Sequence, residues 1–202
     1  LDETGSMGKI PHEIIKDGLP TIMKTIMDAG EKDPQILFLG IGDHLCDQAP
    51  LQVGQFETSD EKLDKWLADL YLEGNGGGNG GESYLLAWYF AARHTSIDCF
   101  EKRGRKGILF TIGDEPTLPG VDVHTLKNLM GDGEYKNYTA SELLSLAKEK
   151  YEVYHILITE TTTGSRPETL NGWKKLLGEN VLVVDDYKNV AQTIAKMIIA
   201  PQ

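Results

Sequence analysis

Short apolar runs alternate with longer amphipathic stretches along the whole chain, and this alternation constrains the fold more than any other feature. Short runs rich in Ile, Leu, Val or Phe predict buried strands, whereas apolar residues at helical spacing predict helices. The predicted strands are Gln35–Ile41, Gln52–Thr58, Gly107–Ile112, Tyr154–Thr159 and Asn180–Val184. The predicted helices are Ile10–Ala29 with a kink at Pro20, Asp60–Tyr71, Glu82–Lys102, Ser141–Lys150, Pro167–Leu177 and Asp186–Ile199. The order of these elements predicts an α/β fold.

The composition of the strands predicts how the sheet is built. Gln35–Ile41 and the later strands are nearly continuous apolar runs, as expected for parallel strands buried on both faces by helices. Gln52–Thr58 follows its predecessor after a short connection without a helix, which favours an antiparallel edge strand. We therefore expect one doubly wound, Rossmann-like domain over residues 1–202, with a mostly parallel sheet and helices on both faces.

Charge and cysteine content exclude several classes of function. The formal net charge of −11 argues against nucleic acid binding, because phosphate contacts require a surplus of Lys and Arg. The apolar runs are too short to span a membrane, so we expect no membrane partner. Cys46 and Cys99 are isolated, which indicates neither a zinc site nor a disulfide framework and fits a cytoplasmic location.

Oxygen-bearing side chains occur where predicted strands end, and ligands of open α/β sheets bind at such ends. Asp2, Thr4 and Ser6 alternate in the first loop, while Asp43 and Asp114 follow two of the predicted strands. Carboxylate and hydroxyl oxygens on a short loop suit Mg²⁺, with Mn²⁺ as a substitute and Ca²⁺ less suited. Alone, this pattern is also common as a helix cap.

The run LDETGSMG at Leu1–Gly8 resembles the Asp-x-Ser/Thr-x-Ser-Met loop of von Willebrand factor A (vWA) domains, their metal-ion-dependent adhesion site. The elements that follow also match the order of that family, including Gly80-Gly81 before a helix and Asp114 after a strand. The resemblance implies that Asp2, Thr4, Ser6 and Asp114 hold a divalent cation, which completes its coordination with a side chain of a protein partner. It further implies a bacterial or phage member, for which an acidic partner side chain and an ATPase of the same system are candidates.

The chain departs from the family pattern at the third loop. Glu82 stands where the family has Thr, and Ser83 is next. If Ser83 is the ligand, the site stays near neutral and can attract an acidic partner; if Glu82 is, that attraction weakens. Alternatively, Glu82 is only a first-turn acid that the helix dipole favours. Asp43 is interpreted as a turn residue or as a residue that orients a metal ligand.

The resemblance also places most of the first strand before Leu1. The glycine run Gly74–Gly81 lacks the Lys of a phosphate-binding loop and favours a flexible connection. Two other functions stay open beside the non-enzymatic binding module. One is Mg²⁺-dependent phosphoryl transfer with Asp2 as nucleophile, although Thr4 stands where such enzymes carry a second acid. The other is a structural domain whose site has lost its metal.

Overall fold

A mostly parallel sheet forms the centre of the computed structural model, which describes residues 1–18, 22–72 and 80–199. Strands β3 (Gly107–Gly113), β6 (Tyr151–Ile158) and β7 (Val181–Val184) pair in parallel, in the order β3-β6-β7. β1 (Leu39–Ile41) pairs with β2 (Leu51–Val53) in antiparallel register. The predicted mixed sheet with an antiparallel edge strand is therefore confirmed, although β1 and β2 are shorter than predicted.

The segment Leu1–Glu3 joins the two parts of this sheet. The Asp2 amide donates to the Ile112 carbonyl at 2.8 Å, and the Glu3 amide donates to the Ile41 carbonyl at 2.9 Å. Asp2 and Ile41 form a parallel bridge. The strand order across the described residues is therefore β2, β1, Leu1–Glu3, β3, β6, β7. From Leu1–Glu3 the chain first adds β1 and β2 on one side and then adds β3, β6 and β7 on the other side. The strand order therefore reverses at Leu1–Glu3, and open α/β sheets bind ligands at such a point.

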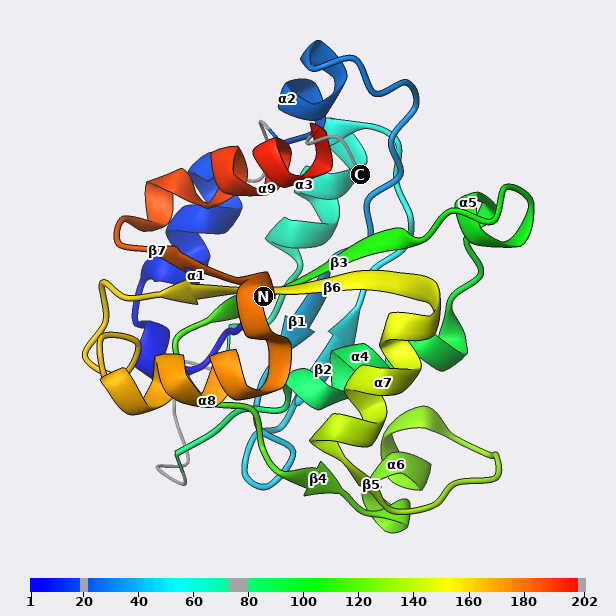
Figure 1. Cartoon of the computed structure of the whole chain (residues 1–202), viewed down its shortest axis with the longest axis vertical. Coiled ribbons are helices and arrows are strands. Elements are labelled where there is room, and N and C mark those ends of the chain that lie inside the picture. Colours follow the sequence, from blue (N-terminus) through cyan, green and yellow to red (C-terminus); the bar gives the residue numbers. More distant parts are fainter. Residues whose placement is uncertain (19–21, 73–79, 200–202) are drawn as a thin grey trace.

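Helices cover both faces of the sheet, as predicted (Figure 1). On one face, α4 (Tyr84–His94), α7 (Ala140–Lys150) and α8 (Pro167–Leu177) contribute a core that includes Trp88, Leu143 and Trp173. The other core has residues of α1 (Ile10–Glu13), α2 (Ile22–Asp28), α3 (Asp60–Ala68) and α9 (Val190–Ile199). None of the helices in the described ranges combines the length and apolarity needed to cross a membrane.

Two predicted helices are interrupted. Ile10–Ala29 splits into α1, a π-helical turn at Ile14–Gly18, and α2, while Pro20 lies outside the described residues. The prediction of one helix from Glu82 to Lys102 was wrong, because α4 ends at His94 and α5 (Asp98–Glu101) follows. The break occurs at Thr95, whose extended backbone leaves the helix and whose hydroxyl lies 2.5 Å from the Tyr151 hydroxyl. A tertiary contact thus overrides local helical spacing.

The sequence analysis missed a small subdomain after β3. It consists of β4 (Gly120–Val121), α6 (Val123–Met130) and β5 (Tyr138–Thr139), with β4 and β5 paired antiparallel. Asp122 caps α6 by accepting a 2.7 Å hydrogen bond from the Thr125 amide. The C-terminal helix was predicted from Asp186, but a 3₁₀ turn at Tyr187–Asn189 precedes α9. This second difference lies at a helix end, where boundaries commonly vary by one or two residues.

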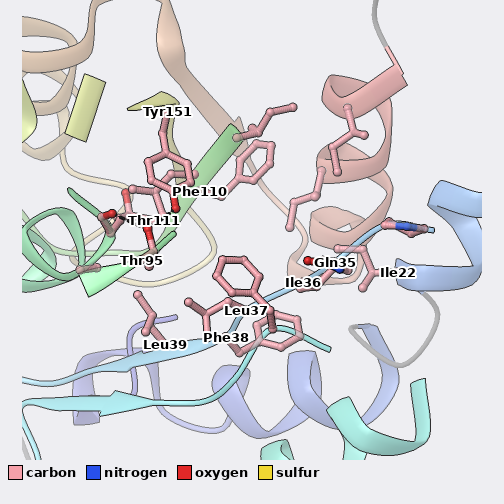
Figure 2. A pocket seen from close by; sticks show the side chains of 18 of the residues that line it. Ile22, Gln35, Ile36, Leu37, Phe38, Leu39, Thr95, Phe110, Thr111 and Tyr151 are labelled. Carbon is pink, nitrogen blue, oxygen red and sulfur yellow. Dashed lines mark hydrogen bonds between the residues drawn. The ribbon is translucent and has the colours of Figure 1, made fainter. Parts of the chain in front are cut away.

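A partly open apolar groove separates β3 from residues 35–39 (Figure 2). Its volume is about 350 Å³. The groove is therefore a substantial gap between two well-packed cores.

Candidate functional site

A chain of hydrogen bonds links the first loop to the end of β3. Asp2 Oδ1 accepts from the Thr4 amide at 3.0 Å and from the Thr4 hydroxyl at 2.7 Å. The Thr4 and Ser6 hydroxyls lie 3.2 Å apart, and Ser6 donates to Asp114 Oδ1 at 2.8 Å. A 3₁₀ turn at Gly5–Met7 places these side chains, and Gly8 closes it with a φ of 57°. The structure thus brings together four of the residues that the sequence analysis selected.

Gly113 leaves room beside β3 for the Tyr84 hydroxyl and the Asp2 carboxyl group. A Cβ at this position would lie 1.9 Å from the Tyr84 hydroxyl oxygen and 2.6 Å from Asp2 Oδ2. The backbone of β3 can therefore reach the first loop only where a side chain is absent. Asp114, the next residue, is fully buried.

We predict that Gly113→Ala lowers the free energy of unfolding by about 2–3 kcal/mol, because the new methyl group forces Tyr84 and Asp2 apart. Urea denaturation monitored by circular dichroism measures this change. Gly172→Ala in α8 is the matched control, since nothing lies within 4 Å of its Cβ. That control should raise stability by up to about 1 kcal/mol. Equal effects of the two substitutions would contradict the prediction.

Tyr84 is a core residue of α4, but its hydroxyl also belongs to the site. The Tyr84 hydroxyl donates to Asp2 Oδ2, so both oxygens of Asp2 have partners. The ring packs edge-on against Trp173 and against His155, with centroid distances of 5.3 Å in both cases. Because its apolar ring follows the helical pattern of α4, no local signal distinguishes Tyr84 from a core residue.

The third loop directs Glu82 and Ser83 differently. Glu82 is held by its backbone, which exchanges hydrogen bonds of 2.9 Å with Pro116 and Leu118. Its carboxyl is buried, and Oε2 has no hydrogen-bond partner. Ser83 Oγ instead lies 2.8 Å from both the backbone nitrogen and the ring Nδ1 of His44. Ser83 thus anchors the loop after β1, whereas Glu82 keeps an oxygen available.

Asp43 organises the same loop after β1. Asp43 Oδ1 accepts from the Leu45 amide at 2.8 Å, and Oδ2 accepts from the Cys46 thiol at 3.1 Å. Its own amide donates to Asp47 at 2.7 Å. These contacts are those of a turn residue.

Burial raises the pKa of three carboxyl groups at the site, those of Asp2, Glu82 and Asp114. Burial raises the pKa of Asp2 to about 6, against the lowering effect of its hydrogen bonds from Tyr84 and Thr4. Burial together with the negative charges of Asp2, Glu115 and Asp43 raises the pKa of Glu82 to about 9. Burial also raises the pKa of Asp114, which hydrogen bonds from Thr161 and Ser6 partly offset. The site is therefore short of positive charge.

The donor set fits a hard divalent cation. Asp114 Oδ2 and Glu82 Oε2 are buried oxygens without a hydrogen-bond partner, an arrangement that needs an explanation such as a bound ion. Among the described residues, no three His, Cys, Asp or Glu side chains form a metal-binding group by themselves. Thr4 and Ser6 add hydroxyl oxygens, so the combined set consists of carboxylate and hydroxyl ligands of the kind that Mg²⁺ accepts.

Two further residues, Thr161 and Glu115, lie beside the site. Thr161 follows β6 and is close enough to Asp114 to lower its pKa. Glu115 is half-buried, and its backbone carbonyl accepts a 2.9 Å hydrogen bond from Trp173 Nε1, which ties α8 to the loop. The acidic pair at positions 114 and 115 was visible in the sequence, but no spacing rule links Thr161 to it.

Comparison with solved structures identifies proteins of similar fold. The pilus adhesin SpaC from Lactobacillus rhamnosus GG aligns with a TM-score of 0.63 and 11% identity, over 98% of this chain and 29% of the adhesin chain. This chain therefore spans less than a third of that adhesin. An aerotolerance-related membrane protein from Bacteroides fragilis aligns with a TM-score of 0.55 and 12% identity, over 98% of this chain and 94% of the other. The likeness is one of fold.

No protein-family profile matches the chain, and no curated protein matches it. The shared fold comes without detectable sequence relationship to a characterised family. The function must therefore be argued from the site itself.

Proposed function

We propose that the chain is a vWA-like module that binds a protein partner through a divalent cation, with Mg²⁺ as the best-suited ion. The observation that carries the proposal is that Asp2, Thr4, Ser6 and Asp114 meet where the strand order reverses. Two buried oxygens there, Asp114 Oδ2 and Glu82 Oε2, have no hydrogen-bond partner. Oxygen ligands in a short, rigid loop favour Mg²⁺ or Mn²⁺ over the larger Ca²⁺.

In this proposal, Asp2, Thr4, Ser6 and Asp114 hold the cation through their side-chain oxygens. The bound cation supplies a Lewis-acidic position that an oxygen of the partner can occupy. A carboxylate from the partner is the best-suited group when Glu82 is protonated, because the site then carries two negative charges of its own. The adhesin among the structures of similar fold agrees with a binding role.

Glu82 is the better candidate than Ser83 for the third loop. Its Oε2 is buried without a partner, and Thr4 and Asp2 are near enough to shift its pKa. Ser83 Oγ is already engaged by His44. If the carboxylate of Glu82 joins the cation, three carboxylates surround two positive charges, and the site favours a neutral oxygen from the partner instead.

Isothermal titration of the chain with Mg²⁺ and with Mn²⁺ tests the proposal, with Asp2→Ala as the comparison. We expect saturable binding by the unaltered chain and none by the variant, since Asp2 supplies one of the proposed carboxylate ligands and is held in place by Tyr84 and Thr4. No binding of either ion by the unaltered chain would overturn the proposal and favour a structural domain.

Ser83→Ala separates the two candidates for the third loop. We predict that the Mg²⁺ affinity of this variant stays within about threefold of that of the unaltered chain. Its free energy of unfolding should be about 1 kcal/mol lower, because it loses the contacts to His44. The same titration and a urea denaturation measure both quantities. A loss of Mg²⁺ affinity of about a hundredfold would instead make Ser83 the ligand.

Phosphoryl transfer has less support. A nucleophile must reach its substrate, yet Asp2 is fully buried and both of its oxygens accept hydrogen bonds. Hydrolysis of p-nitrophenyl phosphate by the unaltered chain, lost in Asp2→Ala, would reverse this ranking.

A further inference from the structure

Strand β7 leaves one edge of the central sheet open. It pairs with β6 on one side, and among the described residues no strand pairs with its other side. The Thr159 amide, just after β6, donates to the Val184 carbonyl at 2.9 Å, so the backbone groups of Val184 point toward β6. Because successive residues of a strand alternate, the N–H and C=O groups of Val181 and Val183 point to the open side.

The open edge also exposes apolar surface. Val183 is 51% exposed, whereas Val184 is 4% exposed. Val181 packs with the core that contains α8, and Leu182 packs with the core that contains α9, so alternate side chains of β7 face the two helices. Figure 1 shows these helices on opposite sides of β7. A strand added beside β7 would cover Val183 and give its outward backbone groups partners.

Acidic side chains stand at both ends of the open edge. Glu179 precedes β7, Asp185 and Asp186 follow it, and all three are exposed. The described ion pairs join none of these acids to the lysines of α8 or to Lys188. Two copies of β7 paired antiparallel about Leu182 would bring Glu179 of each copy near Asp185 of the other, and like charges across a strand pair are destabilising. The acids therefore disfavour a second copy and favour a strand with positive ends.

We propose that the open edge of β7 binds an extended segment of a partner protein, with apolar residues at its centre and Lys or Arg at both ends. Val181 and Val183 each offer one N–H and one C=O group to this segment. Its apolar centre covers Val183, and its basic ends lie beside Glu179 and Asp185. The edge lies at the end of the strand order, away from the point of reversal, so this proposal does not rest on the proposed function.

Synthetic peptides test the proposal by nuclear magnetic resonance of the ¹⁵N-labelled chain. The probe is Lys-Thr-Val-Thr-Val-Thr-Lys with blocked ends. One control peptide replaces both Lys with Glu. The other replaces both Val with Pro, which keeps the charge but removes two N–H donors. The titrations are carried out in EDTA, so their outcome does not depend on metal binding.

We expect the Lys peptide to shift the amide signals of Val181 and Val183 and, at saturation, to slow their hydrogen exchange by about fivefold or more. Its affinity should exceed that of the Glu peptide by about tenfold, because the charge pairs at both ends change from attractive to repulsive. The Pro peptide should leave both amides unchanged. No binding at these amides, or equal affinity for the Lys and Glu peptides, would overturn the proposal.

Reversing the charges of the edge provides a second test. The chain with Glu179→Lys and Asp185→Lys should prefer the Glu peptide by about tenfold. Asp132→Lys with Glu134→Lys makes the same change of charge on the exposed loop after α6, and this control should keep the preference for the Lys peptide. A preference that changes equally in both variants contradicts the proposal. So do β7 amide signals that shift with the concentration of the chain alone, because the edge then pairs with a second copy.

Discussion

Replacing Asp114 with asparagine is expected to weaken Mg²⁺ binding by about a hundredfold or more and, in the same protein, to stabilise the metal-free state. Asp114 is fully buried, and its Oδ2 has no hydrogen-bond partner. Burial raises the pKa of this carboxyl group, which shows that its charge is costly without a cation. Asparagine keeps the acceptor for Ser6 at Oδ1 and removes the charge.

The size of the binding effect follows from the role proposed for the carboxylate. Residues that only orient metal ligands contribute about 10–100-fold to affinity, so an anionic ligand should contribute at least the upper value. Titration calorimetry measures the affinity, and thermal unfolding in EDTA and in millimolar Mg²⁺ measures stability. Asp132→Asn, on the exposed loop after α6, is the control and should change neither. If Asp114→Asn stabilised the protein equally in EDTA and in Mg²⁺, Asp114 would not be a metal ligand.

Glu82→Gln is expected to remove most of the pH dependence of stability of the metal-free protein between pH 7 and 9. The pKa of Glu82 is about 9 in the folded protein, against an ordinary value of 4.5. The folded state therefore holds a proton that the unfolded state has released. The resulting stability is complete below pH 4.5 and is lost as the pH rises through 9, with a slope of up to about 1.4 kcal/mol per pH unit.

Urea denaturation in EDTA at pH 7, 8 and 9 measures this effect as the difference between the unaltered chain and Glu82→Gln. Groups common to both proteins, including Asp2 and the buried His155, cancel in that difference. Glu134→Gln is the matched control on an exposed loop and should leave the slope unchanged. Parallel slopes for the unaltered chain and Glu82→Gln would show that the Glu82 carboxyl is ionised in the folded protein at pH 7.

The same variant reports on the third loop when metal is present. If the Glu82 carboxylate joins the cation, Mg²⁺ binding must release its proton, and the affinity of the unaltered chain should rise by up to about tenfold per pH unit below pH 9. Glu82→Gln should lack this rise. An identical pH dependence in both proteins would place Glu82 outside the metal ligands.

The sequence predicted the elements that depend on local periodicity. The strands Gly107–Ile112 and Asn180–Val184 and the helix Pro167–Leu177 agree closely with β3, β7 and α8. Their apolar residues recur at distances of two to four positions, which the chain itself specifies. Turns such as Gly5–Met7 are also local, so the approximate place of Asp2, Thr4 and Ser6 at a strand end could be read directly. Their role in metal binding stays a prediction.

Tertiary structure decided the features that depend on contacts between distant residues. Thr95 ends α4 because it contacts Tyr151, 56 positions away. Glu82 and Ser83 are neighbours in the sequence, but they have different surroundings. Ser83 contacts His44, whereas a Glu82 oxygen is buried without a hydrogen-bond partner. Tyr84 reaches Asp2 only because Gly113 has no side chain. Periodicity fixes which face of an element is apolar, whereas the polar partner of a buried side chain is fixed only when the strands and helices pack.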